Sequence, residues 1–460
     1  MKRTYVSWWA AIYLAYGAIP SVGSDPSLSN LHDRPAYQES DRVQAAANQF
    51  HGRFQDCTKE IVAHALALID RSERESAALD RRWYVFRRFG ENLEQILKAR
   101  EVRFYGGREV DVLRAIASQY VSLAPIEPDQ DPGEIRLFSA RLDANSSDLI
   151  IIGQNGREVA LKTVIRLVYL LKFMDEKYKR DFVGLASFLR KVKIYLSSTP
   201  ARQEFTSFFR QYGITDPDVV MIGFQRDARA VMTEAGIRAP ERYSSDSLRV
   251  NWYPNANGKK ILLVSINGNR IFASRAGELI EAMLETFRSP PRTMVFFGSA
   301  GAIDSAKLLG HIVAPIVVEL DEDSHSDRRG EKLAHVIRNR ATAIVPVKTA
   351  HISVANILVE TLNWAAKNSQ RKIMTVDQEL FHVISAFNTS PRASQIQLLV
   401  GLLVTDNVPA TVSPPETSLQ YAEDVIARTA RVRRQFFSKV LAEAGIIAHR
   451  LAPNMVQNGQ

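Results

Sequence analysis

Cysteine is nearly absent from this chain, and its absence sets the first limits on the class of protein. Cys57 is the one cysteine among 460 residues, so no disulfide can form within the chain. The nine histidines are scattered, and no Cys/His group has the spacing of a zinc site. We therefore expect no metal ion and no organic cofactor. The sequence also has no recognisable nucleic-acid-binding motif.

A long hydrophobic run is missing as well. Residues 5–20 are mostly apolar, but this stretch is too short to span a bilayer comfortably, so we expect no membrane span. It follows a basic start and leads into small residues, as in a secretory signal peptide. Residues 1–24 are thus a possible signal peptide or an ordinary helix. The first alternative predicts an exported protein and the second a cytoplasmic one. Residues 25–45 are polar, contain two prolines and predict a linker.

The length and charge of the chain indicate how many domains it can form and which ligands it can attract. A chain of 460 residues is long enough for two domains, and a composition of 46% hydrophobic and 24% charged residues is typical of globular proteins. The net charge is +9. The basic clusters are either solvated helix faces or a surface that attracts an anionic ligand.

The hydrophobic pattern divides the chain into two parts. Residues 46–205 have apolar residues at helical spacing and one predicted hairpin, formed by 135–142 and 149–152. They predict a helix-rich N-terminal domain of unknown role. From residue 212 to about 445, short apolar strands alternate with amphipathic helices. This alternation predicts an α/β domain with a central, mostly parallel mixed sheet between layers of helices.

Two early strands of the predicted α/β domain run into glycine turns. Residues 216–235 predict a strand, a turn at Gly223 and a helix that carries Arg226 and Asp227. Residues 261–282 repeat this order around Gly268. Because glycine has no Cβ, such a turn lets backbone N–H groups approach a ligand closely. A plain strand-to-helix connection is the alternative at each turn.

The most informative segment is a buried strand that runs into four small residues and then turns polar. These residues are Gly298, Ser299, Ala300 and Gly301. We expect their backbone to form a cradle for a ligand at the carboxyl end of the strand, where ligands of α/β sheets bind.

Two later strands end in carboxylates. Gln378 and Glu379 follow the strand predicted at 372–376, and Asp406 follows the strand at 398–404. Two separated carboxyl groups can serve one reaction in different roles, one as a proton donor to a leaving group and the other as a stabiliser of developing positive charge. Alternatively, each carboxylate begins a helix, where the helix dipole favours it.

The order and spacing of these segments resemble the nucleoside phosphorylase/nucleosidase superfamily, over the C-terminal half of the chain only. The resemblance implies that Asp406 protonates the purine and that Glu379 holds the ribose hydroxyls. It places the stretch 298–301 near the water or the anomeric carbon. Gln378 stands where the family has a methionine that packs against the sugar.

The first glycine loop and residue 296 separate the possible reactions. The resemblance implies that Arg226 or Asp227 positions water or a phosphate. Phosphorylases of the hexameric type have a phosphate-binding arginine where this chain has Phe296, and an aromatic ring cannot replace a guanidinium there. The resemblance therefore favours hydrolysis of a purine nucleoside or nucleotide to the free base.

Two alternatives stay open. One is a non-catalytic nucleotide-binding or sensing domain on the same fold. The other is a phosphate-dependent phosphorylase that takes its arginine from elsewhere, for example Arg226. By analogy with the family, the protein is expected to form a homo-oligomer. His351 and His382 are further candidate site residues, with a packing or surface role as the alternative for each.

Overall fold

The computed structural model describes most of the chain between residues 53 and 448. The described residues are 53–75, 93–126, 135–143, 145–153, 156–178, 185–245, 248–265, 273–303, 306–321, 334–345, 347–354, 360, 362–408 and 425–448. The chain divides into two units, Met1–Ala45 and Ala46–Gln460. The predicted signal peptide and linker fall in the first unit and lie outside the described residues.

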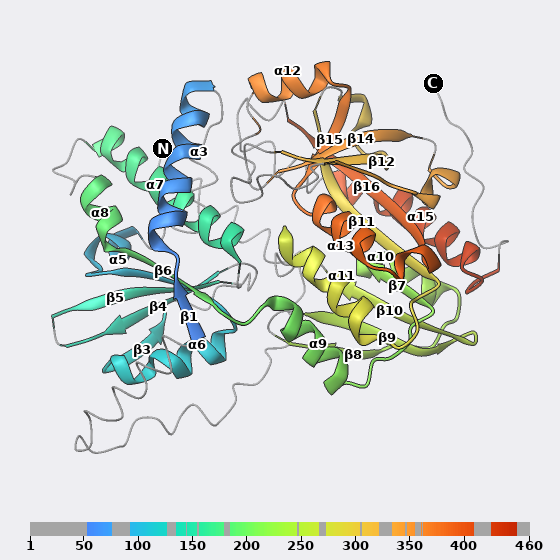
Figure 1. Ribbon diagram of the computed structural model, residues 1–460, viewed down its shortest axis with the longest axis horizontal. Helices are drawn as coiled ribbons and strands as arrows, with labels where there is room; N and C mark the ends of the chain where they lie inside the picture. Colours follow the sequence, from blue (N-terminus) through green and yellow to red (C-terminus); the bar gives the residue numbers. More distant parts are fainter. Residues whose placement is uncertain are drawn as a thin grey trace, which may run out of the picture. The chain divides into compact units, whose positions relative to one another are not determined.

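The N-terminal part of the larger unit contains a six-stranded sheet, with the order β1-β6-β2-β5-β4-β3 (Figure 1). Its strands are β1 (Phe54–Asp56), β2 (Val102–Gly106), β3 (Ser122–Pro125), β4 (Ile135–Arg141), β5 (Ser147–Gly153) and β6 (Val192–Ser197). Its helices are α3 (Thr58–Glu75), α5 (Leu93–Lys98), α6 (Glu109–Ile116), α7 (Arg157–Tyr178) and α8 (Leu185–Lys191).

The prediction of a helix-rich N-terminal domain needs a correction. The hairpin is confirmed, since β4 and β5 pair antiparallel. The other four strands were missed, so this part is an α/β structure. β1 and β3 are only three and four residues long, and β6 follows α8 without a break, so none of them stands out from the helical pattern.

Helices cover both faces of this first sheet (Figure 1). Alternate residues of β2 and β5 point to opposite sides because successive side chains of a strand do so. Phe104 and Ile151 pack in one cluster with residues of α3 and α7. Tyr105 and Ile150 pack in another with residues of α6.

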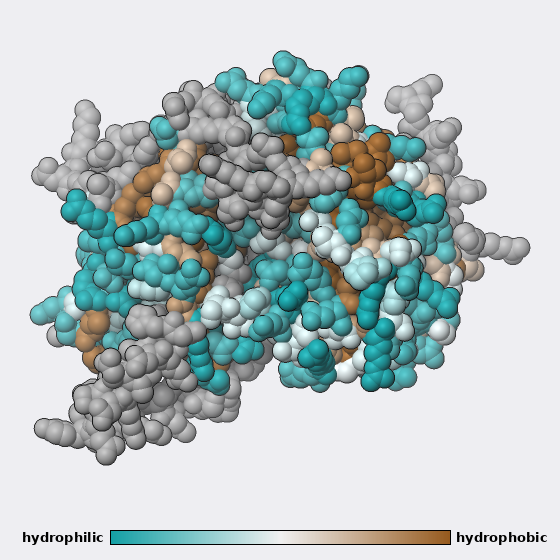
Figure 2. Space-filling model, viewed as in Figure 1, coloured by the Kyte–Doolittle hydropathy of each residue, from teal (hydrophilic) through white to brown (hydrophobic). Residues whose placement is uncertain are grey.

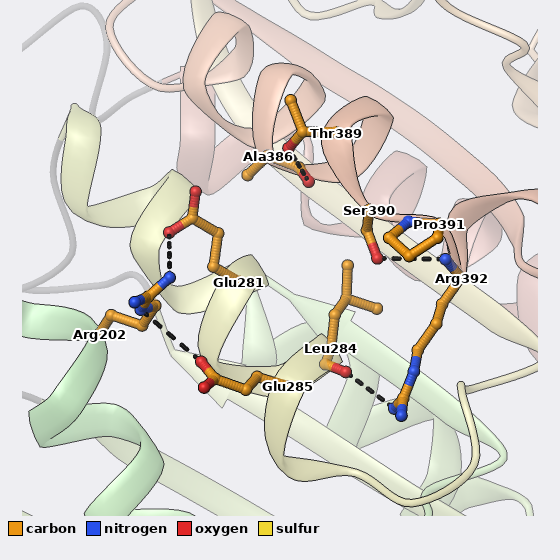
Figure 3. A pocket seen from close by; sticks show the side chains of 9 residues that line it. All are labelled: Arg202, Glu281, Leu284, Glu285, Ala386, Thr389, Ser390, Pro391 and Arg392. Carbon is orange, nitrogen blue, oxygen red and sulfur yellow. Dashed lines mark hydrogen bonds and ion pairs between the residues drawn. The ribbon is translucent and has the colours of Figure 1, made fainter.

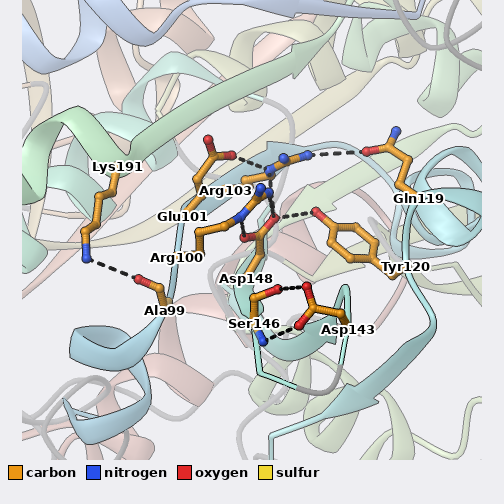
Figure 4. Close-up of polar contacts among 10 residues, drawn as sticks. All are labelled: Ala99, Arg100, Glu101, Arg103, Gln119, Tyr120, Asp143, Ser146, Asp148 and Lys191. Carbon is orange, nitrogen blue, oxygen red and sulfur yellow. Dashed lines mark hydrogen bonds and ion pairs between the residues drawn. The ribbon is translucent and has the colours of Figure 1, made fainter.

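A buried carboxylate ties β2 to β5 (Figure 4). The side chain of Asp148 has no exposed area and accepts hydrogen bonds from Arg100 Nε at 3.0 Å and from the Tyr120 hydroxyl at 3.0 Å. Arg103 Nε lies 3.2 Å from its second oxygen. Burial is the largest cause that raises the pKa of Tyr120, so its hydroxyl remains a donor. The two arginines supply the opposite charge that a buried carboxylate requires.

The C-terminal part contains a ten-stranded mixed sheet, with β16 beside the path β13-β12-β14-β15-β11-β7-β10-β9-β8. Its strands are β7 (Val219–Ile222), β8 (Glu241–Ser244), β9 (Arg249–Ala256), β10 (Lys259–Ser265), β11 (Thr293–Ala302), β12 (Ile312–Leu320), β13 (Ala334–Val336), β14 (Lys348–Ser353), β15 (Ile373–Asp377) and β16 (Gln397–Asn407). Its helices are α9 (Ala201–Gln211), α10 (Gln225–Glu234), α11 (Ser274–Thr286), α12 (Leu362–Gln370), α13 (Leu380–Thr389) and α15 (Ala430–Glu443).

The predicted alternation of strands and helices is thus present, and both faces of the sheet are covered. Even-numbered residues of the central strands, such as Leu262 and Phe296, pack with residues of α9, α11 and α13. Odd-numbered residues, such as Leu263 and Phe297, pack with residues of α10 and α15. Double burial explains why these strands are continuous apolar runs in the sequence.

The parallel character of the sheet is weaker than predicted. β10, β7, β11 and β16 run parallel, as do β12, β14 and β15. β16 also pairs antiparallel with β12, and β15 pairs antiparallel with β11. Strands β11, β15, β14, β12 and β16 therefore form a closed ring, which brings the ends of β15 and β16 to the same part of β11.

The surface is mostly hydrophilic on the face drawn in Figure 2, where hydrophobic residues form separate patches. The large hydrophobic side chains exposed among the described residues are Val110, Val121, Ile316 and Val336. Single exposed side chains of this kind are normal for a folded protein.

Candidate active site

Three strands bring the predicted acid close to the predicted sugar-binding segment. In the registers of β15, β11 and β16, Val376 pairs with Gly301 and Gly301 pairs with Asp406. A Cβ on Gly301 would lie 3.0 Å from Asp406 Oδ2 and 3.3 Å from a methyl group of Val376. Glycine at this position therefore makes room for the Asp406 carboxyl beside the strand that leads to Gln378 and Glu379.

The stretch of small residues continues the strand, whereas the sequence analysis expected it to form a cradle where the strand ends. β11 continues through Gly298, Ser299, Ala300 and Gly301, and all four pair with β16. On the other side, β11 pairs with β7 up to Phe296 and with β15 from Gly301. Among the described strands, residues 297–300 thus have a partner on one side only. The expected cradle therefore corresponds to the edge of β11 at residues 297–300, which has no partner on this side among the strands that the structure describes.

Asp406, near the end of β16, has an environment that favours the protonated form of its carboxyl group more than water does. Its side chain is half-buried, and Oδ1 accepts a hydrogen bond of 2.9 Å from the Thr405 hydroxyl. Burial raises the pKa of Asp406, and the hydrogen bond from Thr405 opposes part of the rise. A carboxyl group of this kind is suited to proton donation.

Glu379 lies at the start of α13 and is half-buried, as is Gln378 before it. Burial, followed by the charge of Asp377, raises the pKa of Glu379 to about 8. Backbone N–H groups of Gln378 and of Ala273, at the start of α11, donate hydrogen bonds to its carboxyl and oppose the rise. Its side chain makes no hydrogen bond to the N–H groups of α13.

Glu360 is an acidic residue near this group that the sequence did not single out. Burial raises its pKa well above the usual range, and the charges of Asp406 and Asp377 raise it further. It therefore lies within electrostatic reach of both. Its position two residues before α12 resembles an ordinary acidic helix start, which hid it in the sequence.

A buried polar network surrounds Asp377. His351 Nε2 lies 2.8 Å from Asp377 Oδ1, and the Ser353 hydroxyl donates a hydrogen bond of 2.6 Å to the same oxygen. His351 Nδ1 lies 2.9 Å from the Thr375 hydroxyl. His351 and Ser353 have no exposed area. The sequence had named His351 as a candidate, whereas Asp377 and Ser353 were missed.

The first glycine loop is followed by two charged residues, Arg226 and Asp227, which the sequence predicted as part of the site. The turn is confirmed, with positive φ angles at Gly223 (94°) and Phe224 (40°). Phe224 packs on Phe297, with ring centroids 5.2 Å apart. The predicted role of Asp227 needs a correction because its Oδ2 lies 2.7 Å from Arg433 Nε in a buried ion pair. Arg226 is exposed on α10.

Two predicted residues remain, Gly268 and His382. Gly268 is outside the described residues. His382 is buried on α13, and its backbone is so close to α11 that a Cβ on Gly277 would lie 2.8 Å from the His382 carbonyl oxygen. This position indicates a packing role for His382.

A cavity of about 400 Å³ opens between α9, α11 and the end of α13 (Figure 3). Arg202 lies 3.8 Å from Glu281 and 3.7 Å from Glu285, and Arg392 donates to the carbonyl oxygen of Leu284. The lining residues are Arg202, Glu281, Leu284, Glu285, Ala386, Thr389, Ser390, Pro391 and Arg392. None of these is a residue that the sequence predicted, and the charges already neutralise one another.

Neither a metal cluster nor a membrane helix is found in the described part of the chain. No group of three or more His, Cys, Asp or Glu residues there has an arrangement that could hold a metal ion. No helix in the same residues is long and apolar enough to cross a membrane.

A methyl group at Gly301 is expected to disturb the site directly. Gly301→Ala places a Cβ 3.0 Å from Asp406 Oδ2 and 3.2 Å from Val408. We expect the free energy of unfolding to fall by about 1–3 kcal/mol, as in other overpacked interiors, and any activity of Asp406 to fall with it. Urea unfolding measures the first effect. The control Gly156→Ala adds a methyl group whose nearest contact is Glu158 Oε2, at 3.5 Å. This control should change neither the free energy of unfolding nor the activity.

The solved structures that are similar to this protein cover about half of its chain. The sequence matches no protein family and no curated protein. The structure is similar to Helicobacter pylori MTAN, at 12% identity and a TM-score of 0.38, over 49% of this chain and 99% of that chain. It is also similar to Arabidopsis thaliana 5′-methylthioadenosine nucleosidase, at 12% identity and a TM-score of 0.38, over 52% and 99% of the two chains. A third similar structure is a nucleosidase from Colwellia psychrerythraea in complex with adenine, at 17% identity and a TM-score of 0.36, over 51% and 96%.

Proposed function

We propose that this protein hydrolyses the N-glycosidic bond of a purine nucleoside or nucleotide and releases the free base. One observation carries the proposal: the half-buried Asp406 lies against Gly301, beside the strand that leads to Glu379. Two carboxyl groups in separate environments at one site suit a reaction with two different charges to stabilise. The sequence resemblance described above supports the same assignment.

The proposed chemistry divides the roles among three carboxyl groups. Asp406 donates its proton to the purine as the bond between the sugar and the base breaks and its electron pair moves to the base. Glu379 binds the sugar hydroxyls. Glu360, which interacts electrostatically with Asp406, would in its ionised form accept a proton from the attacking water, since Asp227 is paired with Arg433.

Phosphorolysis is less well supported than hydrolysis. Phe296 is buried among the residues of the sheet and carries no charge, so the position that holds an arginine in the hexameric phosphorylases offers no cation to a phosphate here. A nucleotide-binding domain without turnover is the second candidate. It is favoured by the first glycine loop, where Asp227, one of the two residues expected to position water or a phosphate, is paired with Arg433 instead.

The test is the release of free base from a panel of purine nucleosides and nucleotides, followed by chromatography with and without phosphate. We expect release at the same rate in both conditions, with ribose or ribose phosphate as the second product. Ribose 1-phosphate in the presence of phosphate would indicate a phosphorylase. Binding without release, measured by calorimetry, would leave the sensing function.

A further inference from the structure

Helix α13 begins beside the site, and its capping is unusual. By position the residue that precedes the helix is Glu379, yet its side chain makes no capping hydrogen bond. The Leu380 N–H instead donates to both oxygens of Asp377, at 3.2 and 3.0 Å. The Phe381 N–H donates to the Ser353 hydroxyl at 3.0 Å. Two residues of neighbouring strands thus cap the helix in place of the residue at its start.

These two residues belong to a row of polar side chains on the paired strands β14 and β15. His351 pairs with Thr375, and Ser353 pairs with Asp377, so all four side chains lie on one face. Their exposed fractions are 0% for the first three and 8% for Asp377. Buried polar groups of this kind add little stability over apolar residues of similar volume, so their presence calls for another explanation.

We infer that Asp377, held by His351 and Ser353, is a positioning residue that caps α13 and thereby leaves the Glu379 carboxyl available for the substrate. The inference rests on the proposed function and adds to it a reason for the orientation of Glu379. If Asp377 did not bind the Leu380 N–H, the Glu379 carboxyl, which already accepts from the Gln378 and Ala273 N–H groups, would be a competing acceptor for it. Its oxygens would then turn toward the helix and away from the sugar.

The variant Asp377→Ala tests this inference, because it removes both oxygens that accept from the Leu380 N–H, whereas Asn would still cap the helix. We expect hydrogen exchange of the Leu380 amide to rise by about 10-fold, as a local cap weakens, and that of the neighbouring Phe381 amide to rise less. With adenosine and 2′-deoxyadenosine as probes, we expect the preference for the ribonucleoside in kcat/KM to fall by about 10-fold, because a misplaced contact loses its effect. In a Glu379→Gln background, Asp377→Ala should lower this preference no further.

A milder variant and a control guard against general unfolding. Ser353→Ala removes one donor to Asp377 and the acceptor for the Phe381 N–H, and we expect a smaller change in the same direction. Thr349→Val alters a buried residue of the same strand whose hydroxyl has no partner in the described structure, and it should change neither measurement.

The results separate this inference from the proposed function. If the wild type cleaves both nucleosides and Asp377→Ala keeps the full ribose preference, the inference is wrong and the proposed function stands. If the wild type neither cleaves nor binds any nucleoside or nucleotide of the panel, the proposed function fails, and the sugar-binding part of the inference fails with it. Unchanged exchange of the Leu380 and Phe381 amides would overturn the capping part in either case.

Discussion

Asp406→Asn is expected to slow the release of free base by about 10²- to 10⁴-fold, which is the usual contribution of a general acid. The amide has nearly the same shape as the carboxyl group, so it fits beside Gly301, where a Cβ would lie 3.0 Å from Asp406 Oδ2. It has no acidic proton to give to the leaving base. The measurement is kcat for adenosine, with binding of adenosine followed by calorimetry to verify that the site is intact.

The pH profile provides a second test of the same assignment. Burial raises the pKa of Asp406, so its protonated form persists to higher pH than that of an exposed aspartate. On the alkaline side of the profile, the rate should therefore fall as the pH rises through this raised pKa of Asp406, and Asp406→Asn should lose that fall. A 4-nitrophenyl riboside, whose leaving group departs without a proton, should be cleaved by Asp406→Asn with a much smaller loss. An equal loss for both substrates would contradict the role of Asp406 as an acid.

Arg433→Met is expected to lower the free energy of unfolding by about 3–5 kcal/mol, because it leaves the Asp227 carboxylate buried without its partner. The two side chains are 6% and 10% exposed, and Arg433 Nε lies 2.7 Å from Asp227 Oδ2. The guanidinium also lies over the Phe224 ring, 5.0 Å from its centroid. The pair joins α15 to α10 below the first glycine loop. Urea unfolding followed by circular dichroism measures the change.

Arg434→Met is the matched control for this prediction. Arg434 lies 4.0 Å from the other oxygen of Asp227, but its side chain is 48% exposed. Ion pairs of exposed side chains contribute under about 1 kcal/mol, so the control should change the unfolding curve little. The double variant Asp227→Leu with Arg433→Met removes both charges and should recover much of the lost stability. A small effect of Arg433→Met would show that the pair contributes nothing beyond packing.

The α/β character of the C-terminal half could be predicted because its strands are buried on both faces. Residues 261–264 and 294–297 are continuous apolar runs, and each lies between helices on both sides of the sheet. In the N-terminal part the same reasoning failed for β6. Its six residues follow α8 directly, and a short alternating pattern inside a helical region has too few residues to be recognised.

Candidate site residues were predictable where they follow a strand in the sequence. Glu379 and Asp406 were found because each comes at the end of an apolar run. Glu360 was not found because nothing local distinguishes it from an acidic residue before a helix. Asp377 was overlooked because its partners, His351 and Ser353, lie on another strand.

By itself, the sequence determined that strands and helices alternate after residue 212 and that acids follow two of these strands, because periodicity and strand ends are local properties of a chain. Only the tertiary structure decided which acids meet. It placed Gly301 between Val376 and Asp406 through strand registers, and it paired Asp227 with Arg433, 206 residues further along. Pairing across such distances depends on how segments pack, and packing leaves no local pattern in the sequence. The same residue type therefore became a partner in an ion pair at Asp227 and the candidate acid at Asp406.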